Sequence, residues 1–408
     1  MCPARRFDRV TLHGTAARDL SRASTRRPRV AIVTDAIYPY HMGGKESRTH
    51  NLVAGIAGNG YDVHVFTMNW WHGDRTRVDA GVTYHALCRE HPLYNDSRRS
   101  MVEAVVFALA CFRLLWYRFD LIEADQIPHL PVLSIWLVAK VRRTPLVITC
   151  HEFWGPEYWR SYLGPLGSLA AILEKLTVRL PDHIVTPMRG TAAKIIENGA
   201  RPDRVTIVPN GVDAEAIARA ARPAQSFDIL FVGRLLAHKN VDLLIEAIAL
   251  LRDRGTPTTC GIVGTGPERE RLEELSEKYD LVDAITFFGK VGDHSSVFGL
   301  MKAASVFVLP SVREGYGMVV AEALCSGLPV ITVDHPENEA RELVEDGVTG
   351  RICEPTAEAL AAALASVLGS TERPALPERA RRRFSWSESV RSLEAVYRSQ
   401  FDSPAIAR

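Results

Sequence analysis

The segment from Val306 to Gly327, VFVLPSVREGYGMVVAEALCSG, contains the pattern from which the fold is inferred. It begins with a short apolar run rich in Val, which predicts a strand buried on both faces. A turn with Gly315 and Gly317 follows, and the chain continues as an apolar stretch that predicts a buried helix. Strand, glycine-containing turn and helix together form the repeating unit of a doubly wound α/β sheet.

The same unit occurs in two series along the chain, joined by the stretch 209–226. The first series has predicted strands at 30–35, 62–68, 120–124, 145–152 and 183–187 and predicted helices at 46–60, 130–141 and 167–180. The second has predicted strands at 228–235, 258–266, 284–291, 305–311 and 329–334 and predicted helices at 241–255, 267–279, 295–303, 317–327 and 356–369. Two series predict two α/β domains in one chain.

The composition narrows the classes of function. A length of 408 residues, at roughly 100–200 residues per domain, predicts two or three domains. The formal net charge of +1 argues against a dedicated nucleic-acid surface, so no nucleic-acid partner is expected. The seven Cys form no Cys-x-x-Cys pair, which predicts reduced thiols in a cytoplasmic protein, with no zinc cluster and no disulfide framework.

No segment predicts a transmembrane helix. The best candidate, 101–117, carries Glu103 and Arg113 and is shorter than the ~20 apolar residues that a span needs. We interpret it as a helix packed in a core, whose outer face could lie near a membrane. Residues 1–28 form a basic tail without the apolar segment of a secretory signal, and we expect this tail to be disordered. It either contacts acidic lipid or has no role.

The two carboxylates around the turn suggest a ligand. A helix that begins near Gly317 presents unpaired backbone N–H groups and its positive dipole end, which suit a phosphate. Glu322 would lie roughly 7–8 Å along that helix, where it could accept hydrogen bonds from a ribose. Glu314, before the turn, could bind a sugar. The alternative is that Glu314 is an ordinary loop residue and that Glu322 pairs with a nearby Lys or Arg.

Glu314 and Glu322, with seven residues between them, resemble the Glu-x7-Glu motif of retaining glycosyltransferases of family 4, which have the two-domain GT-B fold. The resemblance runs from Arg29 to about Phe401. It includes further segments in the family's order: HMGGKE (41–46), TCHEFWG (149–155), PNGVD (209–213), VGRLLAHKN (232–240), GTGPE (264–268) and FSWSESVRSLEAVYR (384–398).

This resemblance implies two Rossmann-like domains that face a central cleft. The implied acceptor domain covers 29–212, and the implied nucleotide-sugar domain covers 213–382. A closing helix within 383–402 would cross back onto the first domain.

The resemblance also implies roles for matching positions. Arg234 and Lys239 would hold the donor diphosphate, since an Arg fork and a Lys point charge can neutralise the leaving phosphate without a metal. Glu314 would bind the sugar hydroxyls, and His151 would lie beside the transferred sugar. The implied donor-binding residues are Gly43, Gly44, Gly264, Gly266, Val291, Gly315, Tyr316, Gly317, Met318 and Glu322.

The remaining implied positions concern the acceptor. Glu46 and His50 could face the acceptor, or Glu46 could complement the dipole of the first helix. Two positions depart from the family pattern, with Tyr316 after Glu-Gly and Glu152 where Asp is common. An aromatic stretch, 153–159, follows Glu152 and could stack on a sugar, touch a membrane or simply be packed.

We therefore expect transfer of a hexose-type sugar from a nucleotide diphosphate-sugar, either GDP-mannose or a UDP-sugar, to a hydroxyl of a glycan or a lipid-linked acceptor. Retention of configuration follows from the resemblance. The chain has no Asp-x-Asp motif, so neither a metal nor a cofactor is expected. Basic residues at 5–29 and 379–383 suggest peripheral contact with the inner face of a membrane.

Alternatives remain within the same fold. One is another GT-B activity, such as a nucleotide-sugar epimerase or a phosphorylase. The other is a non-catalytic protein that binds sugar nucleotides, although an intact set of Glu314, Glu322, Arg234 and Lys239 argues against a degenerate site. A nicotinamide-dependent dehydrogenase is remote, because GTGPE lacks the Gly-x-Gly-x-x-Gly fingerprint.

Overall fold

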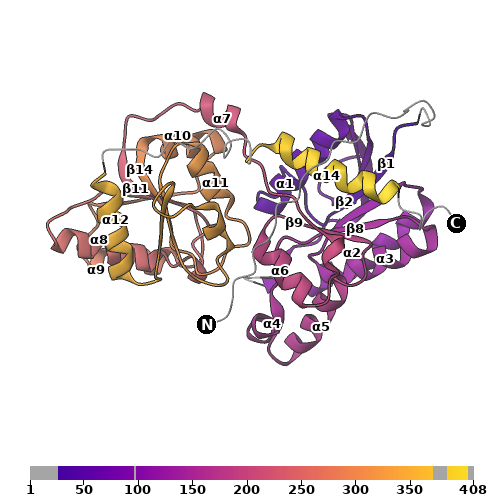
Figure 1. The fold of residues 1–408 in the computed structure, drawn as a ribbon, viewed down its shortest axis with the longest axis horizontal. Helices are drawn as coiled ribbons and strands as arrows, with labels where there is room; N and C mark the ends of the chain where they lie inside the picture. The colour runs from indigo at the N-terminus through magenta and orange to yellow at the C-terminus, as the bar shows by residue number, and fades with distance from the viewer. Residues whose placement is uncertain (1–25, 96–97, 371–383, 403–408) are drawn as a thin grey trace, which may run out of the picture.

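The computed structural model describes residues 26–95, 98–370 and 384–402. Within these residues the chain forms two large α/β units that lie side by side (Figure 1). Each is built on a mainly or wholly parallel sheet, so the predicted pair of doubly wound domains is confirmed. No helix in the described ranges is long and apolar enough to cross a membrane. The basic tail, apart from residues 26–28, and 379–383 lie outside the described residues.

The N-terminal sheet has the strand order β10-β9-β8-β7-β1-β2-β4-β3. All neighbouring pairs are parallel except β3 with β4, a hairpin that was not predicted from the sequence. Its strands are β1 (Arg29–Val33), β2 (Asp62–Asn69), β3 (Thr76–Asp79), β4 (Val82–Arg89), β7 (Leu121–Asp125), β8 (Leu146–Thr149), β9 (His183–Thr186) and β10 (Val205–Ile207). The central strands are buried almost along their whole length, as expected when helices cover both faces.

The helices of this unit connect successive parallel strands. They are α1 (Gly44–Gly58), α2 (Met101–Cys111), α3 (His129–Arg142), α4 (Gly155–Leu163), α5 (Gly167–Thr177) and α6 (Arg189–Glu197), with 3-10 turns at Phe112–Trp116, Gly164–Leu166 and Pro202–Arg204. A small separate hairpin pairs β5 (Tyr94–Asn95) with β6 (Arg98–Arg99). The predicted helix 101–117 therefore ends at Cys111 and continues as a 3-10 turn.

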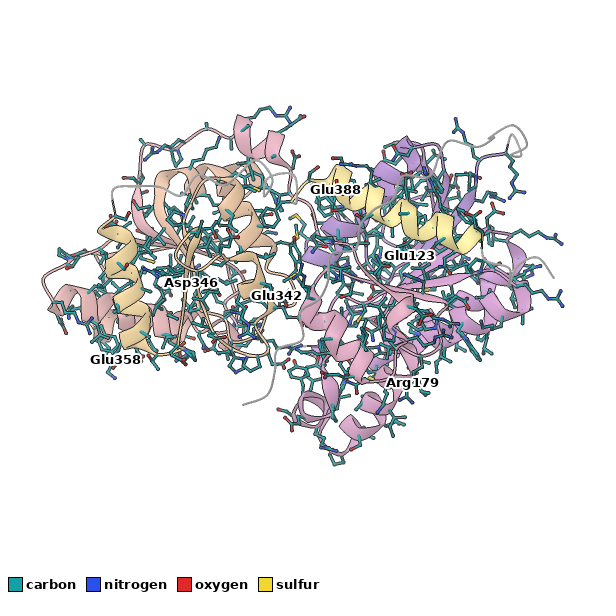
Figure 2. The ribbon with its side chains drawn as sticks, in the orientation of Figure 1. Glu123, Arg179, Glu342, Asp346, Glu358 and Glu388 are labelled. Carbon is teal, nitrogen blue, oxygen red and sulfur yellow. The ribbon has the colours of Figure 1, made fainter. Side chains whose placement is uncertain are left out.

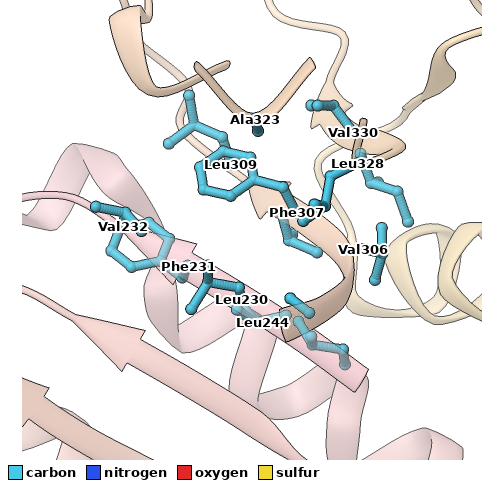
Figure 3. Packing of buried hydrophobic residues seen from close by; sticks show 14 of the residues in the cluster. Leu230, Phe231, Val232, Leu244, Val306, Phe307, Leu309, Ala323, Leu328 and Val330 are labelled. Carbon is cyan, nitrogen blue, oxygen red and sulfur yellow. The ribbon is translucent and has the colours of Figure 1, made fainter. Parts of the chain in front are cut away.

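The C-terminal sheet has the order β13-β12-β11-β14-β15-β16 and is parallel throughout. Its strands are β11 (Phe227–Val232), β12 (Cys260–Val263), β13 (Ile285–Gly289), β14 (Ala304–Leu309), β15 (Val330–Val333) and β16 (Gly350–Cys353). Phe231 of β11 and Phe307 of β14 are buried in its core (Figure 3).

The helices of the second unit cover both faces of its sheet. They are α7 (Ala214–Arg219), α8 (Val241–Asp253), α9 (Arg269–Lys278), α10 (His294–Ala303), α11 (Met318–Cys325) and α12 (Ala357–Leu368), with 3-10 turns at Ala237–Lys239 and Glu339–Leu343. The strand β14, the turn and the helix α11 are the segment from which the fold was inferred, and all three form as predicted.

Helix α14 (Trp386–Phe401) confirms the predicted return of the chain to the first unit (Figure 1). Val390 and Leu393 pack in the same apolar cluster as Leu52 and Ile56 of α1. A Cβ added at Gly55 would overlap Val390, so the two helices approach closely where Gly55 has no side chain. Tyr397 is fully buried and donates a hydrogen bond to Glu123 of β7. The exact domain limits given above stay a prediction.

Candidate active site

The residues that were predicted to bind the donor diphosphate and the donor sugar follow the carboxyl ends of β11 and β14. The connection after β11 contains Arg234 and Lys239, and the turn after β14 contains Glu314. The Val312 N–H donates to the His238 carbonyl at 3.0 Å, which holds the two connections side by side. Adjacent parallel strands end at one edge of a sheet, which is the edge where α/β folds bind ligands.

Lys239 and Glu314 form an ion pair across these two connections. Both side chains are mostly buried, with 15% and 12% of their surface exposed. Arg234 lies on the same connection as Lys239, and its side chain is exposed. The structure therefore joins the predicted phosphate-binding Lys directly to the predicted sugar-binding Glu, and leaves Arg234 at the surface.

The turn between Glu314 and α11 depends on two glycines. Gly317 is the N-cap of α11 and adopts φ 74°, and a Cβ there would lie 2.5 Å from the Cβ of Ala340. A Cβ at Gly315 would lie 2.5 Å from Cγ of Glu152, which belongs to the N-terminal unit. The first glycine thus brings the two units together, and the second provides the left-handed residue that starts the helix at Met318.

Tyr316 lies between the two glycines, but its side chain points away from the turn. It is 6% exposed, and its hydroxyl donates to the Asn210 carbonyl at 2.9 Å. Tyr316 was predicted to contact the donor, but only its backbone, and not its side chain, faces the turn where a donor would bind. Its phenol instead ties the turn to the segment that joins the two units.

Glu322 lies on α11, half-buried, with no ion pair or hydrogen bond from its carboxylate to any residue that the structure describes. The alternative in which Glu322 pairs with a nearby Lys or Arg is therefore not seen. Burial raises the pKa of Glu322 to about 8. A carboxyl group without a partner among the described residues suits a hydrogen-bonding ligand in this position.

Two further predicted donor-binding residues of the C-terminal unit, Gly264 and Gly266, lie beside the backbone around Arg234. A Cβ at Gly264 would overlap the Gly233 carbonyl, and a Cβ at Gly266 would overlap the Leu235 carbonyl. These two glycines let the connection after β12 pack directly on the backbone at either side of Arg234. Val291 follows β13 and is a partly buried neighbour of the core.

The N-terminal unit brings its glycine loop to the start of α11. Gly43 is the N-cap of α1, and a Cβ at Gly44 would lie 3.5 Å from Cγ of Met318. Gly44 of the N-terminal unit therefore lies next to the first residue of α11. The contact of Gly43 and Gly44 with a donor stays a prediction. The starts of α1 and α11, two positive dipole ends, lie close to each other.

The acceptor candidates lie along α1. The Glu46 carboxylate turns back over Gly43, and its Oε1 lies 3.9 Å from Nζ of Lys45. Glu46 and His50 line one small pocket, together with Tyr38 and Tyr84. The ring centroids of His50 and Tyr38 are 4.9 Å apart. The structure thus brings the two acceptor candidates together beside the first loop.

His151 follows β8 and belongs to a buried charge network. Its Nε2 lies 2.9 Å from Oδ1 of Asp125, and Oδ2 of Asp125 lies 3.5 Å from Nζ of Lys45. Lys45 also forms an ion pair with Asp35, which forms another with Arg99. Sequence reasoning missed this network, although Asp35 and Asp125 both stand at carboxyl ends of buried strands.

The charges in the network control one another. Burial alone would raise the pKa of Asp125, but Lys45 and then His151 lower it to about 2. Burial likewise opposes the charged form of Asp35, and Lys45 and Arg99 together still lower its pKa. Asp35, Asp125 and Glu46 raise the pKa of Lys45 against its burial. The network therefore holds fixed charges next to His151 at neutral pH.

Arg313, directly before Glu314, connects the two units. Its guanidinium lies 3.1 Å from Oε2 of Glu152 and stacks 3.7 Å above the ring of Tyr158. It also faces the ring of Trp154 at 4.9 Å. These aromatic residues were expected in a loop, but Tyr158 lies on α4. Phe153 and Trp159 are buried, and Trp154 and Tyr158 pack against Arg313, which agrees with the packed alternative.

A second set of contacts joins the two units between the 3-10 turn Glu339–Leu343 and the start of α6. Glu339 accepts hydrogen bonds from the Thr191 N–H at 2.8 Å and the Thr191 hydroxyl at 2.6 Å. Glu342, on the side of the C-terminal unit that faces the N-terminal unit, accepts from the Gly190 N–H at 2.9 Å (Figure 2). The units therefore meet through charged and polar groups, which a rotation of one unit can exchange with water.

Two Rossmann-like units, with the glycine loop of one against the start of α11 in the other and the Lys239–Glu314 pair at that point, have the architecture of a GT-B glycosyltransferase. Two family models match the chain: "Glycosyltransferase Family 4" over residues 42–216 and "Glycosyl transferases group 1" over residues 212–383. The chain belongs to this glycosyltransferase family, as predicted. It is an enzyme that transfers a sugar from a nucleotide-sugar donor.

Relatives with known names agree with this assignment. Glycogen synthase of Mycobacterium tuberculosis is 28% identical over 396 residues, covering 90% of this chain and 94% of the relative. The gpi3 subunit of phosphatidylinositol N-acetylglucosaminyltransferase from Schizosaccharomyces pombe is 28% identical over 383 residues, covering 90% of this chain and 80% of the relative. The two names point to different acceptors, a polysaccharide and a lipid.

Solved structures share the fold. Sucrose-phosphate synthase from Thermosynechococcus elongatus superposes with a TM-score of 0.75 at 22% identity, covering 92% of this chain and 99% of the other. HepE from Anabaena, in complex with UDP and glucose, superposes with a TM-score of 0.68 at 18% identity, covering 91% of this chain and 100% of the other. Both support the GT-B architecture.

Proposed function

We propose that this enzyme transfers a hexose-type sugar from GDP-mannose or a UDP-sugar to a hydroxyl of a glycan or glycolipid, with retention of configuration. The observation that carries the proposal is the Lys239–Glu314 ion pair, placed directly before the glycine turn and the start of α11. One side chain suits the diphosphate and the other suits the sugar, at the point where a nucleotide diphosphate-sugar would lie across a helix N-terminus.

The chemical step breaks the bond between the sugar carbon and the phosphate oxygen, and negative charge develops on the departing diphosphate. Lys239, Arg234 and the N–H groups at the start of α11 are the groups that would stabilise that charge. The acceptor hydroxyl oxygen forms the new glycosidic bond, and its proton passes to the phosphate oxygen that leaves. We propose that this transfer needs no bound metal, because fixed cations and the helix dipole can supply the stabilisation.

Donor binding would then exchange partners. The ion pair between Lys239 and Glu314 would break. Lys239 would then bind the diphosphate, and Glu314 would bind the sugar hydroxyls. Glu322 would receive the ribose hydroxyls, which supply the hydrogen bonds that its half-buried carboxylate lacks among the described residues. Closure of the two units over the donor would exclude water from the reacting atoms.

The acceptor side of the site supports a proposal about the chemical class of the acceptor and not about its identity. Glu46, His50 and the buried charge network with His151 would face the incoming hydroxyl. The names of the relatives point to both a polysaccharide and a lipid, so either class fits. We propose a cytoplasmic enzyme that works at the inner face of the membrane when the acceptor is lipid-linked.

The first experiment is a thermal-shift panel of UDP-, GDP-, ADP- and dTDP-sugars, run once with EDTA and once with Mg²⁺. A donor at one hundred times its dissociation constant should stabilise the protein by about 2.7 kcal/mol. One nucleotide-sugar should shift the wild type and fail to shift Arg234→Ala. If no nucleotide-sugar shifts the wild type, the donor site is wrong. A shift that needs a divalent metal would overturn the metal-free step.

A second assay separates transfer from epimerisation and from simple binding. The bound donor is incubated with and without candidate acceptors, and free nucleotide is measured. Release that depends on an acceptor identifies a transferase. A changed sugar without nucleotide release would identify an epimerase, and neither change would identify a binding protein.

A further inference from the structure

Helix α2 presents apolar side chains to the outside of the N-terminal unit. Met101, Val102, Val105 and Leu109 keep between 45% and 65% of their surface exposed, and their spacing places them on one stripe of the helix. The one charged residue of the α2 sequence, Glu103, is fully buried and lies 3.7 Å from the Arg99 guanidinium. The outward stripe of α2 therefore contains no charge.

Helix α3 packs beside α2 and extends this apolar surface (Figure 1). Leu137 and Val141, one turn apart, are 45% and 71% exposed. We call the four exposed residues of α2 together with Leu137 and Val141 the apolar helix face. The inner sides of α2 and α3 pack on the sheet through Phe107 and Ile135. The exposed outer residues are therefore not part of the core.

The third helix of this layer has the same property. Helix α5 contacts α3, and it exposes Leu169, Ile172 and Leu176 at helical spacing. Scattered exposed apolar residues are ordinary in proteins, but unpartnered stripes on three neighbouring helices indicate an interaction surface.

The charged residues of α3 and of the segments that follow α2 and α3 are mainly cations. Residues 104–119 and 126–151 contain no Asp or Glu, and they contain five cations: Arg113, Arg118, Lys140, Arg142 and Arg143. Lys140 forms an ion pair with Asp182 at 3.2 Å, which partly offsets its charge. A second copy of this chain placed on the same face would bring like charges together, whereas an anionic surface would neutralise them.

Trp116 adds a further feature. It lies in the 3-10 turn after α2, between Arg113 and Arg118, and 77% of its surface is exposed. A Trp flanked by Arg is typical of side chains at the boundary between lipid and water, where the ring is buried and the cations meet lipid phosphates.

We propose that the apolar helix face binds an anionic lipid bilayer, with α2 and α3 lying in the headgroup region and Trp116 at its boundary. The charge-free stripes supply apolar burial, and the surrounding Arg and Lys residues supply electrostatic attraction. This surface includes the outer face of 101–117, which the sequence already placed near a membrane, and it adds α3 to that face. It does not involve the basic tail or the aromatic stretch.

The apolar helix face lies near the acceptor side of the active site. Arg99 lies two residues before α2 and pairs with Asp35 of the network that contains His151. A bilayer under α2 therefore lies next to the acceptor side of the site, where a lipid-linked hydroxyl could enter. This last step rests on the proposed function, whereas the bilayer contact itself does not.

The test is flotation of the full chain with vesicles of phosphatidylcholine alone and of phosphatidylcholine with 30% phosphatidylglycerol. The wild type should float with the anionic vesicles and lose most of this binding in high salt. Val105→Gln with Leu109→Gln should lower the bound fraction by about tenfold or more, because two buried apolar side chains are lost. Val282→Gln with Val348→Gln, at equally exposed positions of the C-terminal unit, is the matched control and should float like the wild type.

Three results would overturn the proposal, two of them from flotation and one from sedimentation. The first is a wild type that stays unbound with both vesicles, and the second is a Val105/Leu109 variant that floats unchanged. The third is a wild type that sediments as a dimer without lipid while the variant is a monomer, which would identify the face as a protein interface. The thermal shift with the donor, measured on the same proteins, reports the active site separately. A donor shift without flotation overturns only the membrane face, and flotation without a donor shift overturns only the proposed function.

Discussion

Lys239 and Glu314 lie 75 positions apart in the sequence and form an ion pair at the carboxyl edge of the C-terminal sheet. The pair joins the connections that follow β11 and β14, two neighbouring strands. In the free enzyme each side chain thus satisfies the other's charge. A donor that separates them must offer a phosphate to one and hydroxyls to the other, which selects for a sugar linked to a phosphate.

The first prediction concerns Lys239. Lys239→Ala should lower kcat/KM for transfer by about 100-fold or more, because one cation that faces the leaving diphosphate is lost. It should also weaken the thermal shift that the donor produces. Arg254→Ala removes an exposed cation of the same unit and is the control, with unchanged kinetics. Equal kinetics for Lys239→Ala and the wild type would remove Lys239 from the donor site.

The second prediction compares two glycines with similar φ. Gly317 has φ 74° and faces Ala340, whereas Gly327 has φ 80° and has open space where a Cβ would stand. Gly327→Ala should cost about 1 kcal/mol of unfolding free energy from backbone strain alone. Gly317→Ala should cost clearly more, because its methyl group must displace Ala340.

Urea unfolding of the two variants checks this difference. Gly317→Ala should also weaken donor binding, because the start of α11 moves. If the two variants lose equal stability, the close packing of Gly317 on Ala340 is not present in solution.

The third prediction uses the raised pKa of Glu322. With a pKa of about 8 in the folded protein, Glu322 binds a proton that the unfolded chain has already released at neutral pH. The folded state therefore binds more protons, and the unfolding free energy should fall as the pH rises from about 5 to 8. Glu103, whose pKa burial raises to about 7, should contribute a slope of the same sign.

Denaturant unfolding between pH 5 and pH 8 checks this prediction. Glu322→Gln should flatten the slope and leave the Glu103 contribution in place. Glu274→Gln, a substitution on α9, is the control and should keep the wild-type slope. An unchanged slope in Glu322→Gln would mean that Glu322 is ionised in the folded protein.

Different parts of this structure could be predicted from the sequence with different success. The buried strands, such as 30–33 and 306–309, were predictable because a strand covered on both faces is apolar at every position. The turn at 315–317 was predictable because its residue types are restricted by the backbone. The orientation of Tyr316 was not, since a Tyr fits equally well on a ligand or in a core.

The buried charge network shows where sequence reasoning ends. Asp35, Lys45 and Asp125 come from three elements, and each one alone is an ordinary charge in the sequence. Only the strand order, with β1 between β2 and β7, places them together. The aromatic stretch 153–159 was hard to interpret for the same reason, because its partner Arg313 belongs to the other unit.

The fourth prediction tests Asp125 as a positioning residue for His151. Asp125→Asn keeps the size of the side chain but removes the charge that faces Nε2 of His151 and Nζ of Lys45. The rate constant kcat should fall by about tenfold or more, since His151 loses the partner that fixes its ring. Donor binding, measured by thermal shift, should stay close to that of the wild type.

The pH profile of kcat distinguishes positioning from a general loss of structure. The profile should shift in Asp125→Asn, because the charge beside His151 is gone, and it should be unchanged in the surface control Asp203→Asn. A variant with lower kcat and an unshifted profile would contradict the positioning role.

The fifth prediction concerns the contact between the two units at Arg313. Arg313→Lys keeps the charge that faces Glu152 but loses the flat guanidinium that stacks on Tyr158 at 3.7 Å. The two units should then separate more often, because the remaining links are polar pairs such as Thr191 with Glu339 that water can replace.

Small-angle X-ray scattering should show a larger radius of gyration for Arg313→Lys than for the wild type, and saturating donor should reduce the difference. Arg351→Lys, at an exposed position of β16, is the matched control and should scatter like the wild type. If Arg313→Lys is as compact as the wild type, the stacked guanidinium does not hold the units together, and closure depends on the contacts around Glu339 and Glu342 instead.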